Sequence, residues 1–448
     1  MSKSTISIFG LGHVGLTFAV CLAHRGFQII GYDIDEEKLQ CIMSGKAPFY
    51  EANLDELLAA VIRMKRIQLT NNPQDAVSNS SITFVTVDTP IKPNGSVDLS
   101  SLAKALQAIG QGLRRKDNWH LVVIRSTVPP GTCLKVIKVL EEYSGKRAGA
   151  DFGLCFNPEF LREGNAIEDI MNPDRIVIGE YDSMSGEALE EFYKQFHGEK
   201  LPLIIRTSLT NAEIIKYANN AFLAMKISFI NMIANLCEKL PGADITEVAK
   251  GIGLDRRIGL SFLNAGVGWG GSCFLKDLKA LIYVAKENGL DLPLVEATIS
   301  INDEQPLKLI ELARKLLGTL ENKRIAVLGL AFKPGTDDMR NAPSIKIINK
   351  LLDEKARVVV YDPRALHNAR KIFGDKIEYA VSSIQCIQGA DCALIVTEWP
   401  EFKELKPEHF IKNMRTPCVI DGRRIYDPKE FEGKIKFAAI GLNQLKHE

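Results

Sequence analysis

The residues most able to do covalent chemistry lie in the run Gly-Trp-Gly-Gly-Ser-Cys-Phe-Leu-Lys-Asp, which ends at Asp277. Cys273 follows a glycine-dense stretch, residues 266–271, and stands at the expected start of a helix. A helix dipole and the nearby Lys276 would both favour the nucleophilic thiolate there. Asp277, four residues on, would share its helical face. A lone cysteine is more often a small buried side chain, but the glycines before this one favour a nucleophile.

A second pair of residues with suitable chemistry is Lys216 and Asn220. They lie in a long segment without Pro or Gly, residues 211–239, whose apolar residues recur at helical spacing. Side chains four residues apart on a helix face the same way. A lysine can act as a general base and an asparagine can stabilise an oxyanion. From the residues alone, a solvated helix face is the alternative interpretation.

Near the start of the chain, the β-rich run 6–9 leads into Gly-Leu-Gly-His-Val-Gly and then into a helical pattern. The three glycines of such a motif permit a tight turn, close approach of a pyrophosphate, and close helix–strand packing. The helix N-terminus adds free N–H groups for the phosphates. Asp33 ends the next expected strand, where a ribose-binding carboxylate belongs. Incidental glycines in a tight turn are the alternative. The predicted dinucleotide-binding residues are Gly10, Leu11, Gly12, His13, Val14, Gly15 and Asp33.

The acidic residues after Asp33 favour NAD over NADP as the cofactor. Asp35, Glu36 and Glu37 follow it closely and would repel a 2′-phosphate. Lys38 is the nearby cation. It is placed either to cover the adenosine side of the cofactor or to stand as a solvated helix residue.

The elements that must position these residues alternate between short apolar runs and helical segments. The runs expected to be strands in the first third are 6–9, 28–32, 81–87, 121–125, 153–156 and 176–179. Such alternation predicts a mainly parallel sheet with helices on both faces. A helical region follows, and from Lys323 a second alternating pattern begins. The prediction is an α/β protein with two Rossmann-like doubly wound domains joined by a long central helix and a helical domain. The expected boundaries are 1–205, 206–305 and 306–448.

Composition excludes several classes of protein. The 448 residues suit two or three domains, and 56 Lys+Arg against 55 Asp+Glu give a net charge of +1, without the basic excess of a nucleic-acid binder. Nine scattered cysteines, none in a CxxC pair, indicate neither a disulfide framework nor a metal site. No leader is evident and no apolar run is expected to span a bilayer. We therefore expect a cytoplasmic protein without a metal, a membrane or a nucleic-acid partner.

The chain resembles the UDP-glucose/GDP-mannose dehydrogenase family over nearly its whole length. The resemblance rests on motifs that occur in one order along the sequence. They are GLGHVGL from Gly10, VDTP ending at Pro90, RSTVPPGT from Arg125, NPEFLREG from Asn157, IKYANNAFLAMKISFIN from Ile215, GWGGSCFLKD ending at Asp277, and AFKPGTDDMRNAPS from Ala331.

The resemblance implies a mechanism. Family members oxidise C6 of a nucleotide sugar to a carboxylate with two NAD⁺, and Cys273 would carry a thiohemiacetal and then a thioester. Lys216 and Asn220 would handle the substrate oxygen, and Asp277 would orient water and the lysine. The catalytic residues implied are Cys273, Lys216, Asn220, Asp277, Glu159 and Thr127. The cofactor residues implied beyond the glycine motif are Asp33, Lys38, Thr89, Thr127, Glu163, Lys276 and Arg340. The substrate residues implied are Glu159, Phe160, Leu161, Arg162, Glu163, Lys216, Asn220, Arg257, Asn264, Gly270, Cys273, Phe332, Lys333 and Arg424.

Within the family, the residues around Arg257 and Cys273 look most like the UDP-glucose branch. The runner-up is GDP-mannose or another UDP-sugar, although the N-acetylmannosamine branch usually has a His where this chain has Ser272. More distant rivals are a 6-phosphogluconate-type hydroxyacid dehydrogenase and an inactive nucleotide-sugar binding protein. The resemblance also implies a homodimer or higher homo-oligomer, because the family's arginine that matches Arg257 often reaches across a subunit interface. The segment 211–239, with apolar positions on more than one face, suits a dimer seam, and a buried core helix is the alternative. Two departures from the family pattern are His13, where Tyr is usual, and Asp88, where Asn or a small residue is common.

Overall fold

The computed structural model describes residues 4–443, which divide into two compact units. The first unit extends to Asn219 and includes Lys279–Gly289; the second contains Asn220–Leu278 and the chain from Leu290 onward. Two of the three divisions fall inside helices, α9 (Leu209–Cys237) and α11 (Phe274–Glu287), and the third follows α11 at Gly289. The three domains expected from the sequence stay a prediction, because contacts assign the central helical region to both units.

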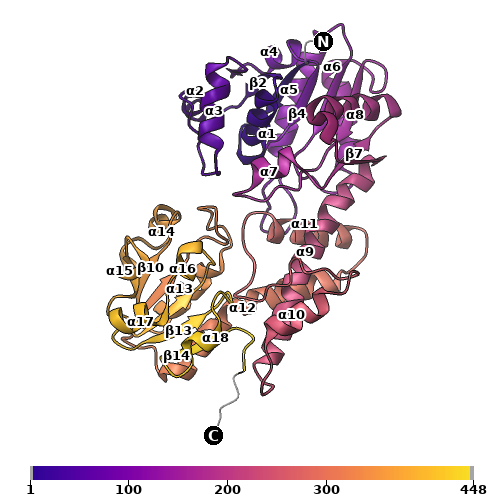
Figure 1. Ribbon diagram of the computed structural model, residues 1–448. Helices are drawn as coiled ribbons and strands as arrows, with labels where there is room; N and C mark the ends of the chain where they lie inside the picture. The colour runs from indigo at the N-terminus through magenta and orange to yellow at the C-terminus, as the bar shows by residue number, and fades with distance from the viewer. Residues whose placement is uncertain (1–3, 444–448) are drawn as a thin grey trace. The chain divides into compact units, whose positions relative to one another are not determined.

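An eight-stranded sheet with the order β3-β2-β1-β4-β5-β6-β7-β8 forms the first unit (Figure 1). Every neighbouring pair is parallel except β6 with β7. The chain order reverses between β1 and β4, and in such sheets ligands bind at the carboxyl ends of the strands beside that reversal. The strands are β1 (Thr5–Phe9), β2 (Gln28–Tyr32), β3 (Ile67–Thr70), β4 (Ile82–Val85), β5 (His120–Ile124), β6 (Phe152–Phe156), β7 (Arg175–Glu180) and β8 (Leu203–Ser208).

Helices cover both faces of this sheet, as the sequence alternation predicts. One apolar cluster packs α1, α3, α7 and α8 against the sheet, and another packs α4, α5, α6 and the start of α9. The strands at the centre are buried on both faces, which explains their continuous apolar runs. The helices are α1 (His13–His24), α2 (Glu36–Met43), α3 (Leu54–Arg63), α4 (Pro73–Ser78), α5 (Ser100–Arg114), α6 (Thr132–Ser144), α7 (Ala166–Met171), α8 (Ser183–His197) and the short 3-10 helix η1 (Gly198–Lys200).

The second unit holds a six-stranded, wholly parallel sheet with the order β11-β10-β9-β12-β13-β14. The two Rossmann-like domains of the prediction are therefore confirmed. The strands are β9 (Arg324–Leu328), β10 (Arg357–Tyr361), β11 (Glu378–Tyr379), β12 (Cys392–Ile395), β13 (Cys418–Asp421) and β14 (Lys436–Ala439). The helices are α10 (Ile245–Gly253), α12 (Pro293–Leu317), α13 (Pro343–Asp353), α14 (Leu366–Phe373), η2 (Gly374–Lys376), α15 (Ser383–Ile387), α16 (Pro400–Lys403), α17 (Pro407–Asn413) and α18 (Pro428–Phe431).

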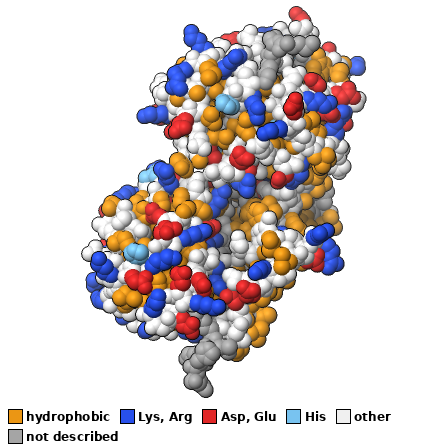
Figure 2. Space-filling model, in the orientation of Figure 1, with side chains coloured by type: hydrophobic (Ala, Val, Ile, Leu, Met, Phe, Trp, Pro, Cys, Tyr) orange, Lys and Arg blue, Asp and Glu red, His pale blue; other side chains and the backbone are white. Residues whose placement is uncertain are grey.

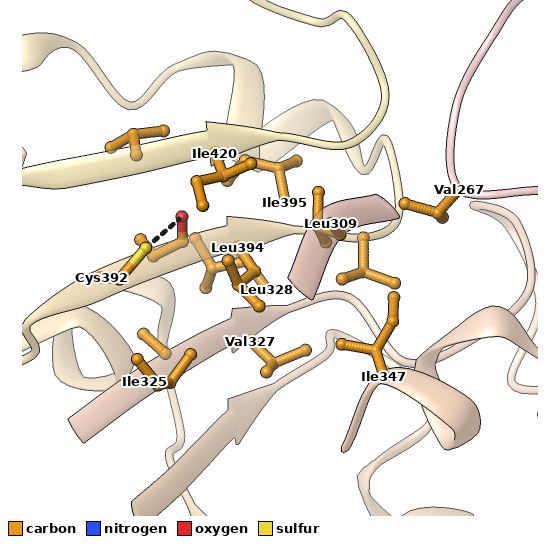
Figure 3. Close-up of a cluster of buried hydrophobic side chains, with 14 of the residues drawn as sticks. Val267, Leu309, Ile325, Val327, Leu328, Ile347, Cys392, Leu394, Ile395 and Ile420 are labelled. Carbon is orange, nitrogen blue, oxygen red and sulfur yellow. Dashed lines mark hydrogen bonds between the residues drawn. The ribbon is translucent and has the colours of Figure 1, made fainter. Parts of the chain in front are cut away.

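One continuous core joins the helical part of the second unit to its sheet. Side chains of β9, β12 and β13 meet Leu309 of α12, Ile347 of α13 and Val267 of the glycine-rich stretch (Figure 3). Val267 is fully buried in this core. The stretch that precedes Cys273 is therefore anchored by the same packing that holds the sheet together.

The surface charges agree with the balanced composition. Acidic and basic side chains are interspersed over the face shown in Figure 2.

The expectation that no apolar run is long enough to span a bilayer needs correction. By length and composition alone, α9 could cross a membrane, with a mean hydropathy of 1.3 in its most apolar window. The core helix of a soluble protein passes the same test. Buried polar side chains along α9, Glu213, Lys216, Asn220 and Asn231, show that its inner faces serve protein contacts.

Candidate active site

The glycine turn after β1 has the shape that a dinucleotide requires. Gly10 has a positive φ of 94°, and a Cβ there would lie 2.9 Å from the Thr86 carbonyl oxygen. A Cβ on Gly15 would clash with the Gly10 carbonyl. At Gly12, by contrast, the nearest atom to such a Cβ is Asp88 Oδ1 at 3.9 Å. Two glycines are thus required by packing and the third leaves open space beside the N-terminus of α1, where a pyrophosphate fits.

Asp33 closes this turn from the end of β2. Its Oδ2 accepts a hydrogen bond of 2.7 Å from the Leu11 N–H and lies 2.9 Å from Lys38 Nζ. Lys38 Nζ also donates to Oδ1 at 3.1 Å. One carboxylate therefore fixes the glycine turn and holds a cation at the ribose position. The predicted cofactor residues of this turn come together as expected.

Further predicted residues lie at the carboxyl ends of neighbouring strands. The hydroxyl of Thr89 donates to the carbonyl of Thr127 at 2.8 Å, which ties the segment after β4 to the segment after β5. Phe160 lies under the Arg175 guanidinium, 4.1 Å from its ring centroid. Arg162 forms an ion pair with Asp169 at 2.5 Å and is otherwise largely exposed.

Lys216 of α9 forms a buried ion pair with Glu159, which follows β6. Its Nζ lies 2.8 Å from Glu159 Oε1 and 2.6 Å from the Glu159 carbonyl oxygen. The Leu161 N–H donates to the other carboxylate oxygen at 2.6 Å. Burial raises the pKa of Glu159, but the Lys216 ammonium and these hydrogen bonds outweigh it and hold the pKa below its usual value. The charged form of the Glu159 carboxyl is therefore favoured beside Lys216.

Asn220, one turn along α9, meets residues of α11 instead. Its Nδ2 donates to Asp277 Oδ2 at 2.7 Å, and Lys276 Nζ lies 2.6 Å from Asp277 Oδ1. Asp277 is 1% exposed. The buried carboxylate thus fixes the amide of Asn220 and neutralises the cation that the sequence placed beside Cys273. Lys276 is therefore tied to Asp277, and the start of the helix also favours a thiolate at Cys273.

Cys273 stands immediately before α11, as predicted. The Asp277 N–H donates to its carbonyl oxygen at 2.9 Å, so it begins the first helical turn. Its side chain is partly exposed, and its sulfur lies 3.6 Å from Ser272 Oγ. The preceding loop is held by Asn341, whose side chain donates to the Gly271 carbonyl at 3.0 Å, and a Cβ on Gly270 would lie 2.9 Å from Cβ of Phe332. The predicted residues Gly270 and Phe332 therefore pack together in the loop that precedes the thiol.

The polar and basic residues of the second unit that were predicted to contact ligands are only partly gathered. Asn264 and Arg424 line one pocket of about 430 Å³ in the second unit. Arg257 and Arg340 instead pair with carboxylates two residues earlier in the chain, at 2.6 and 2.8 Å, and their side chains are 88% and 64% exposed. Lys333 Nζ lies 5.8 Å from the Phe332 ring centroid. The pocket also contains four residues that the sequence did not single out, Lys250, Glu398, Lys403 and Arg423.

The carboxylate that matches Asp33 in the second sheet has different partners. Asp362 ends β10 as Asp33 ends β2, but its Oδ2 accepts from Leu330 N–H, Ala331 N–H and Trp399 Nε1 at 2.7, 3.1 and 3.0 Å. The side chain of Thr397 fills the space beside Gly329, 2.5 Å from where a Cβ would stand. This carboxylate is satisfied within the fold, and the sequence after β9, Gly-Leu-Ala-Phe-Lys, lacks the full GxGxxG motif of the first domain.

Comparison with known proteins identifies the family. The NAD-binding domain model of the UDP-glucose/GDP-mannose dehydrogenase family matches residues 4–197, the central domain model matches 210–304, and the UDP-binding domain model matches 326–428. The chain belongs to this family. Among curated relatives, it is 44% identical to the UDP-glucose 6-dehydrogenase of Haloferax volcanii over 95% of this chain and 98% of that protein. It is 40% identical to a UDP-glucose 6-dehydrogenase of Bacillus subtilis, over 95% and 90% of the two chains.

Solved structures agree with the family assignment. A UDP-glucose dehydrogenase of Pyrobaculum islandicum superposes with a TM-score of 0.89 at 36% identity and covers 98% of both chains. A UDP-D-ManNAc dehydrogenase of Pyrococcus horikoshii gives 0.86 at 30% identity, over 98% of this chain and 99% of that one. NAD is the cofactor of this family's first domain, and the glycine turn with Asp33 fits it. Among residues 4–443, no group of His, Cys, Asp and Glu could hold a metal ion.

Proposed function

We propose that the protein is an NAD-dependent UDP-glucose 6-dehydrogenase, which oxidises the C6 alcohol of UDP-glucose to the carboxylate of UDP-glucuronate. The full-length similarity to UDP-glucose 6-dehydrogenases supports this reaction. The observation that carries it is Cys273, a partly exposed thiol held ahead of α11 by a packed glycine loop. Bound NAD⁺ supplies the hydride acceptor for each of the two oxidations.

In the proposed mechanism, Cys273 retains the intermediate aldehyde. Its sulfur forms a bond to C6, and the thiol proton goes to the carbonyl oxygen, giving a thiohemiacetal. Loss of a second hydride and a proton leaves a thioester. Water then breaks the C–S bond, which gives the carboxylate and regenerates the thiol. Lys216 and Asn220 stabilise charge on the substrate oxygen, while Asp277 and Glu159 hold these two side chains in place.

The stoichiometry of the reaction tests the proposal. The protein is incubated with NAD⁺ and, in separate samples, with UDP-glucose, GDP-mannose and UDP-N-acetylhexosamines, and NADH is counted per sugar consumed. We expect two NADH per UDP-glucose. One NADH per sugar would favour single-step hydroxyacid-type chemistry, and turnover of another sugar alone would move the protein to another branch of the family. No NADH with any sugar would indicate a binding protein.

A cysteine variant tests the covalent route. Cys273→Ala should lose acid formation and keep NADH binding, because the thiol acts on the sugar and not on the dinucleotide. Cys41→Ala is the matched control, since Cys41 is another partly exposed thiol and lies in α2, outside the predicted site. UDP-glucuronate formation by Cys273→Ala at the wild-type rate would contradict the thioester.

The pocket of the second unit is the proposed binding site for the nucleotide part of the substrate. It has room for part of a nucleotide, about 430 Å³, and four of its side chains are basic, Lys250, Lys403, Arg423 and Arg424. Arg424 is held by Asp244 at 2.8 Å. A phosphate-bearing ligand suits this surplus of positive charge. Arg424→Ala should raise KM for UDP-glucose about tenfold with little change in KM for NAD⁺, since it removes one charged contact; an unchanged KM for the sugar would contradict the assignment.

We further propose that the protein works in the cytoplasm as a homodimer through α9. Phe222, Met225, Phe229, Met232 and Leu236 recur at alternating intervals of three and four residues on this helix, and four of them are 44–58% exposed. Such a stripe is the seam of a helix pair, and two copies of one chain present it symmetrically.

The dimer proposal is tested by mass in solution. Phe229→Glu should convert the dimer to a monomer in light scattering after gel filtration, because a charge in an apolar seam is costly. Ile372→Glu is the control, an equally exposed apolar residue on α14. A monomeric wild-type protein, or a dimer that survives Phe229→Glu, would overturn this interface; partition of the wild type into vesicles would indicate a membrane instead.

A further inference from the structure

Glu51 is a buried carboxylate to which neither the motifs nor the family descriptions assign a role. It lies in the loop between α2 and α3, and its side chain is 1% exposed. Its Oε2 lies 2.8 Å from His13 Nε2 and accepts the Gly164 N–H, also at 2.8 Å. Its Oε1 accepts the Ala166 N–H at 2.8 Å. One carboxylate thus joins three segments that are far apart in the sequence.

The first of these segments is the dinucleotide turn. His13 is the first residue of α1 and directly follows Gly12, beside the open space of the turn. Its ring is held between Glu51 and Phe49, whose ring centroid lies 4.8 Å away. The His13 side chain is 25% exposed, so Glu51 and Phe49 fix its orientation at the rim of the turn.

The second segment is the stretch that joins β6 to α7. At one end, Glu159 is fixed by Lys216. At the other end, Gly164 turns the chain with a φ of 78°, and its N–H and that of Ala166 point at Glu51. Between these two anchors lies Glu163, a predicted contact of both cofactor and substrate. Without Glu51, the far end of this stretch loses two hydrogen bonds to a charged acceptor.

We propose that Glu51 is a positioning residue that couples the dinucleotide turn to the sugar-binding stretch 159–166. It acts through His13 on the cofactor side and through the two backbone N–H groups on the substrate side. Substitutions of His13 and of Glu51 break different contacts and therefore have different consequences. Loss of the His13 contact loosens only the turn, whereas loss of the carboxylate loosens both segments.

Four variants separate these effects. Glu51→Gln keeps the shape but offers one amide oxygen, so at least one N–H is left facing a donor. His13→Leu removes the donor to Glu51, and His13→Gln restores a neutral donor of similar reach. Asp182→Ala is the structural control, because Asp182 caps α8 through the Ser185 N–H at 2.9 Å and has no predicted contact with ligand. NADH affinity is measured by fluorescence titration, and KM for UDP-glucose and melting temperature are measured in parallel.

We expect His13→Leu to weaken NADH binding about fivefold with KM for UDP-glucose unchanged, and His13→Gln to restore it. Glu51→Gln should weaken NADH binding and raise KM for UDP-glucose, each about fivefold or more, with kcat changed less. Asp182→Ala should lower only the melting temperature. If Glu51→Gln behaves like Asp182→Ala, the carboxylate is merely structural and the proposal fails. The NADH titration needs no sugar, so it tests Glu51 even if UDP-glucose is not the substrate.

Discussion

Replacing Lys216 by Met should reverse the pH dependence that Glu159 contributes to stability. In the native protein the pKa of Glu159 is lowered, although burial raises it, because Lys216 and hydrogen bonds favour the carboxylate. A lowered pKa stabilises the fold above the pKa of the unfolded chain, and this contribution disappears on acidification. In Lys216→Met burial dominates, so the carboxyl is expected to be easier to protonate than in the unfolded chain. Its contribution is then favourable at low pH and lost as the pH rises.

The magnitude follows from the burial of the pair. Breaking a buried ion pair from one side costs about 3–5 kcal/mol, and both side chains here are less than 10% exposed. At pH 8 the free energy of unfolding of the variant should therefore fall by about 3–5 kcal/mol. Toward pH 5 the variant should regain up to about 1.4 kcal/mol for each unit by which burial raises the pKa of Glu159 above that of the unfolded chain. Urea unfolding at pH 5, 6.5 and 8, followed by circular dichroism, measures both effects.

Two further variants make this result decisive. The double variant Lys216→Met with Glu159→Gln removes both charges, so it should recover most of the stability that Lys216→Met loses at pH 8. Both variants should lack turnover of UDP-glucose, because each lacks the predicted catalytic lysine. Lys194→Met breaks an exposed pair with Glu190 and should change neither stability nor its pH dependence. If Lys216→Met is as stable at pH 8 as at pH 5, or if the double variant recovers nothing, the pair is not a desolvated charge pair and the reasoning is refuted.

Three other predictions follow from single contacts. Asp88→Asn should lower KM for NAD⁺ roughly threefold, because it removes a negative charge beside the open space at Gly12; an unchanged KM at low salt would contradict this. Burial and the charge of Lys116 lower the pKa of His120 to about 3. His120 takes up a proton below about pH 6.5 in the unfolded chain but not in the folded one. The free energy of unfolding should therefore be about 2 kcal/mol lower at pH 5 than above pH 6.5, and His120→Gln should remove this pH dependence. Asp362→Ala should destabilise the protein by about 2–3 kcal/mol without weakening NADH binding in a titration; weaker binding would indicate a second dinucleotide site.

The parts of the site that the sequence predicted are those encoded over short distances. The turn from β1 to α1 needs glycine at positions where a Cβ would strike the backbone, so Gly10 and Gly15 identify it without tertiary information. Asp33 is predictable because a parallel strand, a turn and a helix have nearly fixed lengths. The start of α11 after Cys273 is likewise local, since glycines precede it and a helical pattern follows.

The partners of the polar side chains could not be predicted in the same way. Lys216 and Asn220 were expected to share a helix face, but each bonds a carboxylate 57 residues away, Glu159 and Asp277 respectively. These residues are far apart in the sequence and meet because the order of the strands and the lengths of the loops bring them to α9. A local sequence pattern does not predict such long-range contacts. Glu51 was missed for the same reason, since its partners lie 38 to 115 residues away and its own loop carries no motif.

Local ion pairs occupy two arginines that are predicted to contact ligands. Arg257 and Arg340 were expected to contact the substrate and the cofactor, respectively, and each carries an aspartate two residues earlier that it bonds through both its backbone and its guanidinium. Such short-range pairs form with little loss of chain entropy and, at an exposed site, contribute little to stability. A diphosphate, with more charge and more acceptor oxygens, can displace them. These pairs therefore keep the two arginines oriented without holding them so tightly that they oppose binding.

The two sheets share one winding order yet only the first is built for a dinucleotide, and the difference lies in how a single carboxylate is used. Asp33 accepts hydrogen bonds from the Leu11 and Asp35 N–H groups, and both of its oxygens also meet Nζ of Lys38, a partly exposed side chain. Asp362 instead accepts from four backbone N–H groups, those of Leu330, Ala331, Arg364 and Ala365, and from the buried Trp399 indole. The same position is therefore predicted to contact the cofactor in the first domain and to stabilise the fold in the second. Topology provides the reversal of strand order in both sheets, and the partners of the carboxylate are what distinguish them.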